Sequence, residues 1–560
     1  MKPNNLFVAL FKKYPLFRLG SIVAVIFLIL GFFSLLSVSA KKVPVIHSVN
    51  PPVGSPGDLM IIEGENFGNQ RSSSDYVQVG ASRITNTGYL SWSDTQIKIL
   101  LPSNVTDGLV IVATKSGQSK PGFFANEAGI PVEVPPDTTT SMPVIAAVTP
   151  ENGTVGSLIA ISGTNFGTIR NNALVYFTAD FDNQNSSEEN VYIPASEDNY
   201  DYEYWSDSEI HVRIPDGASA GQIYVQTEKG ISNLTMLEVK HPAGFKNYSG
   251  KKTYLVNLTA DIQDINSRSN TTLSLHVPRP PVFARQPAAD MTECSPEPVF
   301  DHYQNTIIHQ LDLSNTSSKQ IRFNHSFVID EYSFSADIIE KNVKPFTEKA
   351  RVLYTTFTSP DSIIKCDDED LKALTSVIIK KETNPYTQAK LIYNYMLENY
   401  TLLPSLRKTG SPVKDLVTGR SGDAYDFAII YTTLLRCAGI PAIPVSGILV
   451  DADLKSTNHW WCEFYIENAG WIPADPALGA GLEYKAFKAV ETPAQFYFGS
   501  MDSQHIAFSR GFNEVKPSLA NSHIVYRERS YALQSIWEES SSGTVNYSSL
   551  WNDPVVAGIY

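Results

Sequence analysis

The first half of the chain contains an internal repeat, and this repeat constrains the fold more than any other feature. The block PVIHSVNPPVGSPGDLMIIEGENFG begins at Pro44, and the related block PVIAAVTPENGTVGSLIAISGTNFG begins 99 residues later at Pro143. A second shared block, W-S-D, begins at Trp92 and at Trp205, which are 113 residues apart, so the second copy carries a net insertion. Repeats of this length are duplicated domains, because the units of solenoid proteins are much shorter.

Both copies have the pattern of a β-sandwich. Short apolar runs such as LMIIEGENF and LVIVAT are separated by Gly, Pro and Asn, which is typical of short strands joined by tight turns. The block P-x-I-x-x-V-x-P…G-x-x-x-x-I-x-G-x-N-F-G resembles the IPT/TIG family of immunoglobulin-like domains. The resemblance implies two all-β immunoglobulin-like sandwiches, at residues 43–134 and 142–241. It implies that they serve as spacers or as ligand-binding modules of a cell-surface protein.

The first forty residues predict a membrane segment. Residues 19–40, LGSIVAVIFLILGFFSLLSVSA, carry no charge and are long enough to span the hydrocarbon core of a bilayer. Lysine and arginine within residues 1–18 favour a cytoplasmic N-terminus. We therefore expect a transmembrane helix or signal anchor at 19–40, a single-pass position in the cell membrane, and an extracellular region of residues 41–560. A cleaved signal peptide is the alternative, because residues 38–40 (V-S-A) resemble a cleavage site.

Charge and cysteine content exclude other classes of protein. The formal net charge of −14 argues against a nucleic-acid partner, which requires a basic face. Four cysteines in so long an exported region do not make a disulfide framework. They can form one or two bridges or remain four free thiols, and the sequence does not decide between these alternatives. Sequons from Asn104 to Asn546 permit a glycoprotein. We expect no metal and no cofactor, since the acidic loop near residues 180–203 lacks the spacing of a calcium motif.

The second half of the chain changes from strand patterns to a mixed pattern. Residues 248–345 contain strand-like runs such as TYLVNLTADI and QIRFNHSFVI, and we expect a β-rich domain there. In NPYTQAKLIYNYMLENY, Asn384 is placed to cap a helix and Pro385 lies in its first turn. We therefore expect an α+β domain at residues 346–500, followed by a C-terminal extension at 501–560.

One stretch of the α+β domain has the pattern of an active site but lacks a nucleophilic side chain. In RSGDAYDFAIIYTTLLRCAGIPA, residues 420–442, a small turn precedes a predicted helix, and Ala424 stands where that helix begins. Backbone N–H groups and the helix dipole would stabilise a thiolate at this position. Further on, a predicted hairpin with its turn at residues 467–470 brings Asp475 alongside His459. A carboxylate beside an imidazole orients it and fixes its tautomer, as in a Cys–His–Asp site.

These motifs together resemble the transglutaminase-like superfamily, which has a papain-like fold. The resemblance rests on G-D-A-Y-D-F-A from Gly422, on the GIPA and VSG strand, on H-W-W-C-E-F-Y from His459 and on G-W-I-P-A-D-P from Gly470, and it covers residues 380–500. It implies that His459 is the base and Asp475 the orienting carboxylate. It also implies a cysteine nucleophile where this chain has Ala424. We expect Ala424 to start a helix, with His459 on an adjacent strand facing it and Asp475 behind.

No other residue is well placed to replace the missing nucleophile. Cys437 lies thirteen residues further along the same helix, and Cys462 points to the opposite face of the strand from His459. Cys366 lies among acidic residues, which raise the pKa of a thiol. Ser421 and Asp423 belong to the turn. A substitute nucleophile is therefore the less favoured interpretation.

Three functions follow from the sequence. The favoured one is a membrane-anchored, exported protein whose transglutaminase-like domain is a pseudoenzyme that acts in binding or cell-envelope architecture. The second is an active cysteine-protease-like hydrolase or acyl transferase with a non-standard nucleophile. The third is a surface adhesin or receptor based on the IPT/TIG pair. The expected partners are a surface protein, a peptide or a glycan, together with the membrane itself through the N-terminal helix.

Overall fold

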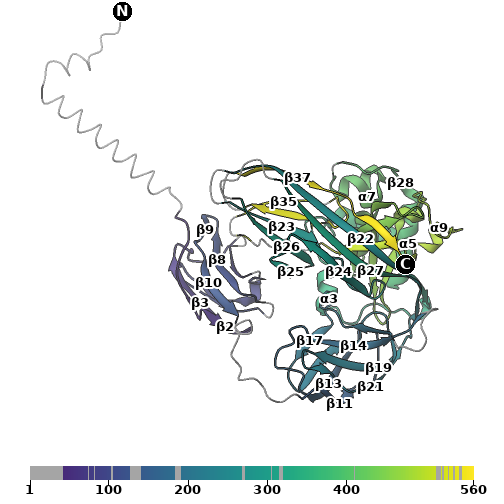
Figure 1. Ribbon diagram of the computed structural model, residues 1–560, viewed down its shortest axis with the longest axis horizontal. Helices are drawn as coiled ribbons and strands as arrows, with labels where there is room; N and C mark the ends of the chain where they lie inside the picture. Colours follow the sequence, from purple (N-terminus) through teal and green to yellow (C-terminus); the bar gives the residue numbers. More distant parts are fainter. Residues whose placement is uncertain are drawn as a thin grey trace, which may run out of the picture. The chain divides into compact units, whose positions relative to one another are not determined.

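The computed structural model of the chain (Figure 1) describes residue 15 and most of residues 42–560. The gaps in the second range are residues 73–74, 81, 103–104, 127–140, 183–190, 268–270, 304, 314–319, 409, 513–518, 520–521, 528, 534–535 and 541–544. The expected transmembrane segment at 19–40 lies outside the described residues, and none of the helices that are described is both long and apolar enough to cross a bilayer. The chain divides into two compact units, Met1–Asp137 and Thr138–Tyr560.

The first unit contains a two-sheet sandwich, as the repeat predicts. One sheet has the order β1-β3-β7-β6 and the other β2-β10-β8-β4-β5, with β9 paired to β8. The strand bounds are β1 Val45–Asn50, β2 Val53–Gly54, β3 Leu59–Glu65, β4 Tyr76–Val79, β5 Ser82–Arg83, β6 Tyr89–Trp92, β7 Gln96–Leu100, β8 Gly108–Thr114, β9 Gly117–Gln118 and β10 Gly122–Asn126.

The G-x-N-F-G signature of the repeat has a local physical cause. A Cβ atom on Gly64 would lie 1.9 Å from the carbonyl oxygen of Val45, so the two paired strands approach each other too closely for any side chain. Asn66 adopts a φ of 63°, a left-handed conformation that asparagine tolerates. The turn that results directs Phe67 into the core, where it is 1% exposed. Gly163 meets the same obstacle in the second copy.

The second unit begins with the second sandwich. Its sheets have the orders β11-β13-β18-β17 and β12-β21-β19-β14-β16, with β20 paired to β19, so they repeat the topology of the first copy. The bounds are β11 Val144–Thr149, β12 Asn152–Thr154, β13 Leu158–Thr164, β14 Leu174–Ala179, β16 Val191–Pro194, β17 Tyr202–Trp205, β18 Glu209–Arg213, β19 Ala218–Thr227, β20 Gly230–Ile231 and β21 Thr235–Lys240.

The β-rich domain follows and consists of two further sheets. One is a seven-stranded sheet built on the long antiparallel pair β22 (Gly244–Ser267) and β27 (Ile321–Ile338), which lie side by side in Figure 1. The other has the order β25-β26-β23-β36-β35. The remaining bounds are β15 Phe181–Asp182, β23 Thr272–Pro278, β24 Ala288–Ser295, β25 Phe300–Tyr303, β26 Thr306–Asp312, β33 Ser500–Met501, β35 His523–Tyr526, β36 Trp537–Ser540, β37 Val545–Trp551 and β38 Val555–Ile559.

Residues 501–560, expected as a separate C-terminal extension, belong to the domains that precede them. Strands β37 and β38 pair with β22, and β36 pairs with β23. Strand β34 (His505–Arg510) instead pairs with β30 of the α+β domain. The boundary at residue 500 is corrected accordingly, because these pairings join segments that are far apart in sequence and no local pattern encodes them.

The α+β domain packs helices against a four-stranded sheet of order β32-β31-β30-β34. Asn384 caps α5 and accepts hydrogen bonds from the N–H groups of Tyr386 and Thr387, with Pro385 first in the helix, as the sequence predicts. The bounds are α3 Val352–Phe357, α4 Glu369–Ile379, α5 Pro385–Asn399, β28 Thr401–Leu402, α6 Val413–Gly419, β29 Ser421–Gly422, α7 Ala424–Cys437, β30 Ala442–Val450, β31 Ser456–Ile466, β32 Gly470–Ala474, α8 Pro476–Gly479 and α9 Pro493–Phe496.

Candidate functional site

Ala424 is the first residue of helix α7, as expected. Asp423 caps the helix and accepts from the N–H of Asp426, while the Asp426 carboxylate accepts from the N–H of Asp423, which forms a reciprocal capping box. Helix α7 packs on β31, where the rings of Tyr425 and Trp460 meet edge to face at 5.6 Å. The frame for an anion at a helix N-terminus is therefore present, with a methyl group at its first position.

The β31–β32 hairpin brings His459 and Asp475 together. Nε2 of His459 lies 2.5 Å from Oδ2 of Asp475, and the two side chains are 2% and 0% exposed. The other carboxylate oxygen, Oδ1, accepts from the N–H groups of Ala477 and Leu478 and so caps α8. Asp475 is thus fixed on both sides and holds the imidazole in one orientation. The catalytic roles that the resemblance implies for these residues stay predictions.

A second imidazole shares the same carboxylate. Nε2 of His505 lies 3.3 Å from Oδ2 of Asp475, and its Nδ1 lies 2.8 Å from Oδ1 of Asp502. The hydroxyl of Tyr497 donates to Oδ2 of Asp502 at 2.9 Å. A continuous polar chain therefore runs from Tyr497 through Asp502, His505 and Asp475 to His459 inside the domain.

The charges in this chain stabilise one another. Burial alone would raise the pKa of Asp475, but the charges and hydrogen bonds of His459 and His505 hold it well below its usual value. The pKa of Asp502 is lowered against burial in the same way, by His505. Burial would lower the pKa of His505, but the two carboxylates on either side raise it. His505 is thus favoured as a cation between two anions.

Sequence reasoning did not find His505. The residue lies outside the motifs, in SQHIAFSR, and the strand pattern around it gives no chemical signal. It reaches the site because β34 pairs with β30, where His505 stands opposite Leu449. A long-range strand register of this kind is not encoded locally.

The N-terminus of α7 is covered by basic side chains from two other segments. Nη1 of Arg529 lies 3.0 Å from Oδ1 of Asp426, and its other nitrogen bonds the Asp423 carboxylate. The Arg529 guanidinium also lies over the ring of Tyr425, 4.3 Å from its centroid. Arg407 bonds the other oxygen of Asp426 at 2.8 Å. Ala424 is only 4% exposed, so it lies at a buried, ion-paired helix end.

The cysteines lie away from the imidazole, as the sequence analysis expects. The side chain of Cys462 points from β31 toward α7, whereas His459 lies on the other face of the strand and stacks on Trp461 with ring centroids 6.3 Å apart. The structure therefore does not bear out the expectation that His459 faces Ala424, because α7 packs on the face of β31 that carries Trp460 and Cys462. Burial raises the pKa of the Cys462 thiol to about 12, and burial also raises that of Cys437 to about 12. Burial likewise raises the pKa of Cys366. Burial thus favours the protonated, less reactive form of these thiols.

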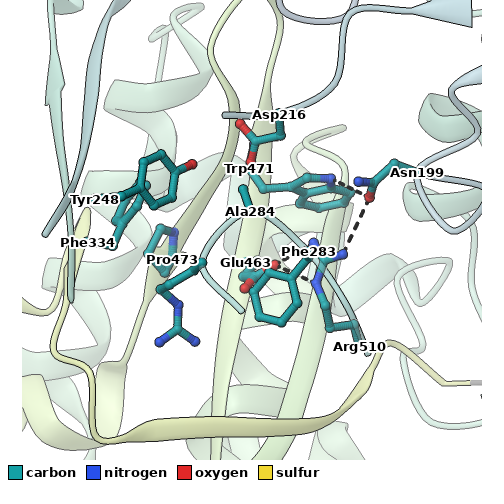
Figure 2. Close-up of a pocket in the computed structure, with 11 residues that line it drawn as sticks. Asn199, Asp216, Tyr248, Phe283, Ala284, Phe334, Glu463, Trp471, Pro473 and Arg510 are labelled. Atoms are coloured by element: carbon teal, nitrogen blue, oxygen red, sulfur yellow. Dashed lines mark hydrogen bonds and ion pairs between the residues drawn. The ribbon is translucent and has the colours of Figure 1, made fainter. Parts of the chain in front are cut away.

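Other residues of the same motifs hold the second sandwich onto the α+β domain (Figure 2). The indole Nε1 of Trp471 donates to Oδ1 of Asn199 at 3.0 Å, and the Trp471 backbone N–H donates to Asp216 at 3.3 Å. Nη2 of Arg510 lies 2.6 Å from Oε2 of Glu463. These side chains enclose a cavity of about 20 Å³, enough for a single water molecule. The junction is therefore closely packed.

Comparison with known proteins identifies the domains. Residues 372–476 match the transglutaminase-like superfamily, and residues 44–126 and 143–241 each match the IPT/TIG domain. The chain therefore contains one transglutaminase-like domain and two IPT/TIG domains, as the sequence motifs predict.

Curated relatives match only parts of the chain. An uncharacterised protein of Haemophilus influenzae is 28% identical over 171 residues, which cover 25% of this chain and 46% of that protein. A cyclomaltodextrin glucanotransferase of Niallia circulans is 33% identical over 79 residues, which cover 14% of this chain and 11% of the enzyme. The chain thus spans less than half the length of these relatives. Among solved structures, a candidate cysteine protease from Cytophaga hutchinsonii shares 16% identity at a TM-score of 0.35, covering 55% of this chain and 93% of that one.

Proposed function

We propose that the chain is an exported, membrane-anchored protein whose transglutaminase-like domain is a pseudoenzyme that acts in binding or in cell-envelope architecture. The observation that carries this proposal is the methyl side chain of Ala424 at the first position of α7. Acyl transfer through a covalent intermediate requires a side-chain atom that attacks a carbonyl carbon. A methyl group has no lone pair with which to do so.

The surroundings of Ala424 support the proposal. Ala424 and His459 are 4% and 2% exposed, so a carbonyl substrate would reach them only after part of the domain moved. Arg529 covers the N-terminus of α7, and its side chain is itself only 11% exposed. The buried helix end thus has the properties of a structural junction.

An active enzyme with a different nucleophile is the alternative, and the thiols argue against it. The thiolate is the reactive form of cysteine, and burial favours the protonated form of all four cysteines. Cys462 is the thiol nearest to His459 in sequence, but its side chain lies on the opposite face of β31 from that of His459.

A binding role of the IPT/TIG domains is compatible with the proposal, and one cluster of side chains favours it. The ring centroids of Tyr176 and Tyr224 lie 4.8 Å apart in a stack, and Tyr192 meets Tyr224 edge-on at 4.9 Å. Tyr176 and Tyr192 also line a cleft of about 580 Å³. Partly exposed aromatic faces beside polar groups offer a flat, amphipathic surface to a sugar ring or a peptide. Replacing Tyr224 by alanine is expected to reduce binding to a glycan array.

Membrane anchoring is tested by carbonate extraction of membranes followed by N-terminal sequencing. We expect the protein to stay in the membrane fraction with residues 19–40 retained. A soluble protein that begins near Lys41 would show that this segment is a cleaved signal peptide.

The proposed lack of catalytic activity is tested by measuring turnover and by the reactivity of an introduced thiol. We expect no transglutaminase or peptidase turnover from the unaltered protein. Ala424→Cys places a thiol at the N-terminus of α7, where the helix dipole lowers its pKa, and this thiol should react with iodoacetamide. Ala428→Cys is the matched control, because residue 428 lies one turn further along the same helix and is also buried.

One outcome would contradict the proposal, and a second would contradict the activating role of the helix N-terminus at residue 424. Robust turnover by the unaltered protein that His459→Ala abolishes would reveal a different nucleophile. A thiol at residue 424 that reacts no faster than the control at residue 428 would show that the helix N-terminus does not activate this position.

A further inference from the structure

Three potential metal ligands meet in the β-rich domain, far in sequence from Ala424 and His459. Cys294 lies on β24, His309 on β26 and His325 on β27. Their ligand atoms all lie within 4.8 Å of one another. Strands β24 and β27 belong to the seven-stranded sheet and β26 to the five-stranded sheet, so the cluster connects the two sheets.

The arrangement of the strands explains why these side chains converge. Cys294 and His325 are direct partners in the antiparallel pair of β24 and β27 and therefore share one face of that sheet. His309 approaches from the opposite sheet, and its ring meets that of His325 edge-on with centroids 5.0 Å apart. The two Nε2 atoms are 2.8 Å apart. Two imidazole nitrogens and a thiol thus point toward one small volume.

The burial of the two imidazoles suits a metal site. His309 and His325 are only 1% and 2% exposed, so a bound ion would be shielded from solvent on the histidine side. Cys294 is half-buried, which leaves an approach from solvent on the thiol side.

The donor set selects the class of ion. Imidazole nitrogen and thiolate sulfur suit zinc and related divalent transition metals, whereas calcium and magnesium require oxygen ligands. Two Zn–N bonds of about 2.0–2.1 Å at a tetrahedral angle place the nitrogens roughly 3.4 Å apart. The Nε2 atoms would therefore separate by only about half an ångström from their present 2.8 Å to admit the ion.

We propose that Cys294, His309 and His325 form a zinc-type metal site that crosslinks the two sheets of the β-rich domain. The ion is bound by Sγ and the two Nε2 atoms, and water occupies the fourth position. Binding releases the thiol proton to solvent. The site is independent of the proposed function, since none of its residues belongs to the transglutaminase-like motifs.

The test uses the full-length protein and cobalt as an optical probe for zinc. We expect one Co²⁺ per chain and a sulfur-to-cobalt charge-transfer band in the near ultraviolet. Cys294→Ser should abolish this band. Cys437→Ser is the matched control, because Cys437 is also a half-buried free thiol, and it should leave the band unchanged. His325→Asn should weaken zinc binding by at least about tenfold.

A second measurement needs no variant and so does not depend on how the variants fold. Zinc should slow the alkylation of Cys294 by iodoacetamide, measured by peptide mapping, and leave that of Cys437 unaffected. The proposal is overturned if the protein takes up no stoichiometric metal, if the cobalt band persists in Cys294→Ser, or if zinc does not slow the alkylation of Cys294. In each of these cases the two histidines form only a hydrogen-bonded pair.

Discussion

Replacing Arg510 by methionine is expected to destabilise the unit Thr138–Tyr560 by about 3–5 kcal/mol, because it leaves the carboxylate of Glu463 buried without a partner. Nη2 and Nε of Arg510 lie 2.6 and 3.0 Å from Oε2 of Glu463. The two side chains are only 8% and 4% exposed, so solvent screens their interaction little.

The magnitude comes mainly from the unpaired charge. Methionine fills much of the volume of arginine, so the cavity contribution is small. The guanidinium also lies 4.6 Å from the ring centroid of Phe283 and 5.5 Å from that of Trp471, and each lost cation–π contact adds about 0.5–2 kcal/mol. The double variant Arg510→Met/Glu463→Gln removes the orphaned charge. It should recover most of the lost stability, because a neutral replacement of a buried ion pair is often tolerated.

Urea titration followed by tryptophan fluorescence measures both effects. The shift in the urea midpoint of the unit Thr138–Tyr560, multiplied by the slope of free energy against urea concentration, gives the change in the free energy of unfolding. A loss below about 1 kcal/mol in Arg510→Met would show that the pair is not desolvated. A double variant no more stable than the single one would refute the argument that the lone carboxylate causes the loss.

Three further predictions concern the same unit. Because His505 has a raised pKa, the stability that it contributes is present below about pH 6.5 and is lost as the pH rises through the folded-state pKa. The urea midpoint should therefore fall as the pH rises from about 6.5 through that pKa, and His505→Gln should make the midpoint less dependent on pH. Asn199→Ala removes the acceptor of the Trp471 indole and should cost about 1–3 kcal/mol, measured by urea titration, with faster proteolysis between the second sandwich and the α+β domain. Deleting residues 545–560 removes β37 and β38 from β22 and should prevent folding, as judged by thermal melting, whereas deleting the first IPT/TIG domain should leave the melting temperature of the rest unchanged.

The sequence predicted the elements whose cause is local. The repeat predicts two sandwiches because the strand alternation, the close approach at Gly64 and the turn at Asn66 are all short-range features. The helix start at Ala424 follows from the Asp423 cap, and the pairing of His459 with Asp475 follows from one hairpin. In each case the residues that decide the structure lie within about twenty positions of one another, on one turn or one hairpin.

The features that the sequence did not predict depend on long-range pairing. His505 and Arg529 both come from the region expected as an extension. His505 lies on β34, which pairs with β30, and Arg529 lies between β35 and β36, the second of which pairs with β23. The metal-ligand cluster has the same character, because its three residues are scattered over three strands without a motif. Strand register across such distances is set by the packed fold and cannot be read from a local pattern.

The motif residues of β31 also contribute to the packing between domains. Along β31, the residues that share a face with His459 are Trp461, Glu463 and Tyr465, since side chains alternate along a strand. Glu463 pairs with Arg510, and the hydroxyl of Tyr465 accepts from Arg351 at 3.1 Å. Loss of any of these would expose or orphan buried groups in the packing of the β-rich domain and the second sandwich. Ala424 differs from these residues, because its methyl side chain needs no polar partner in the fold.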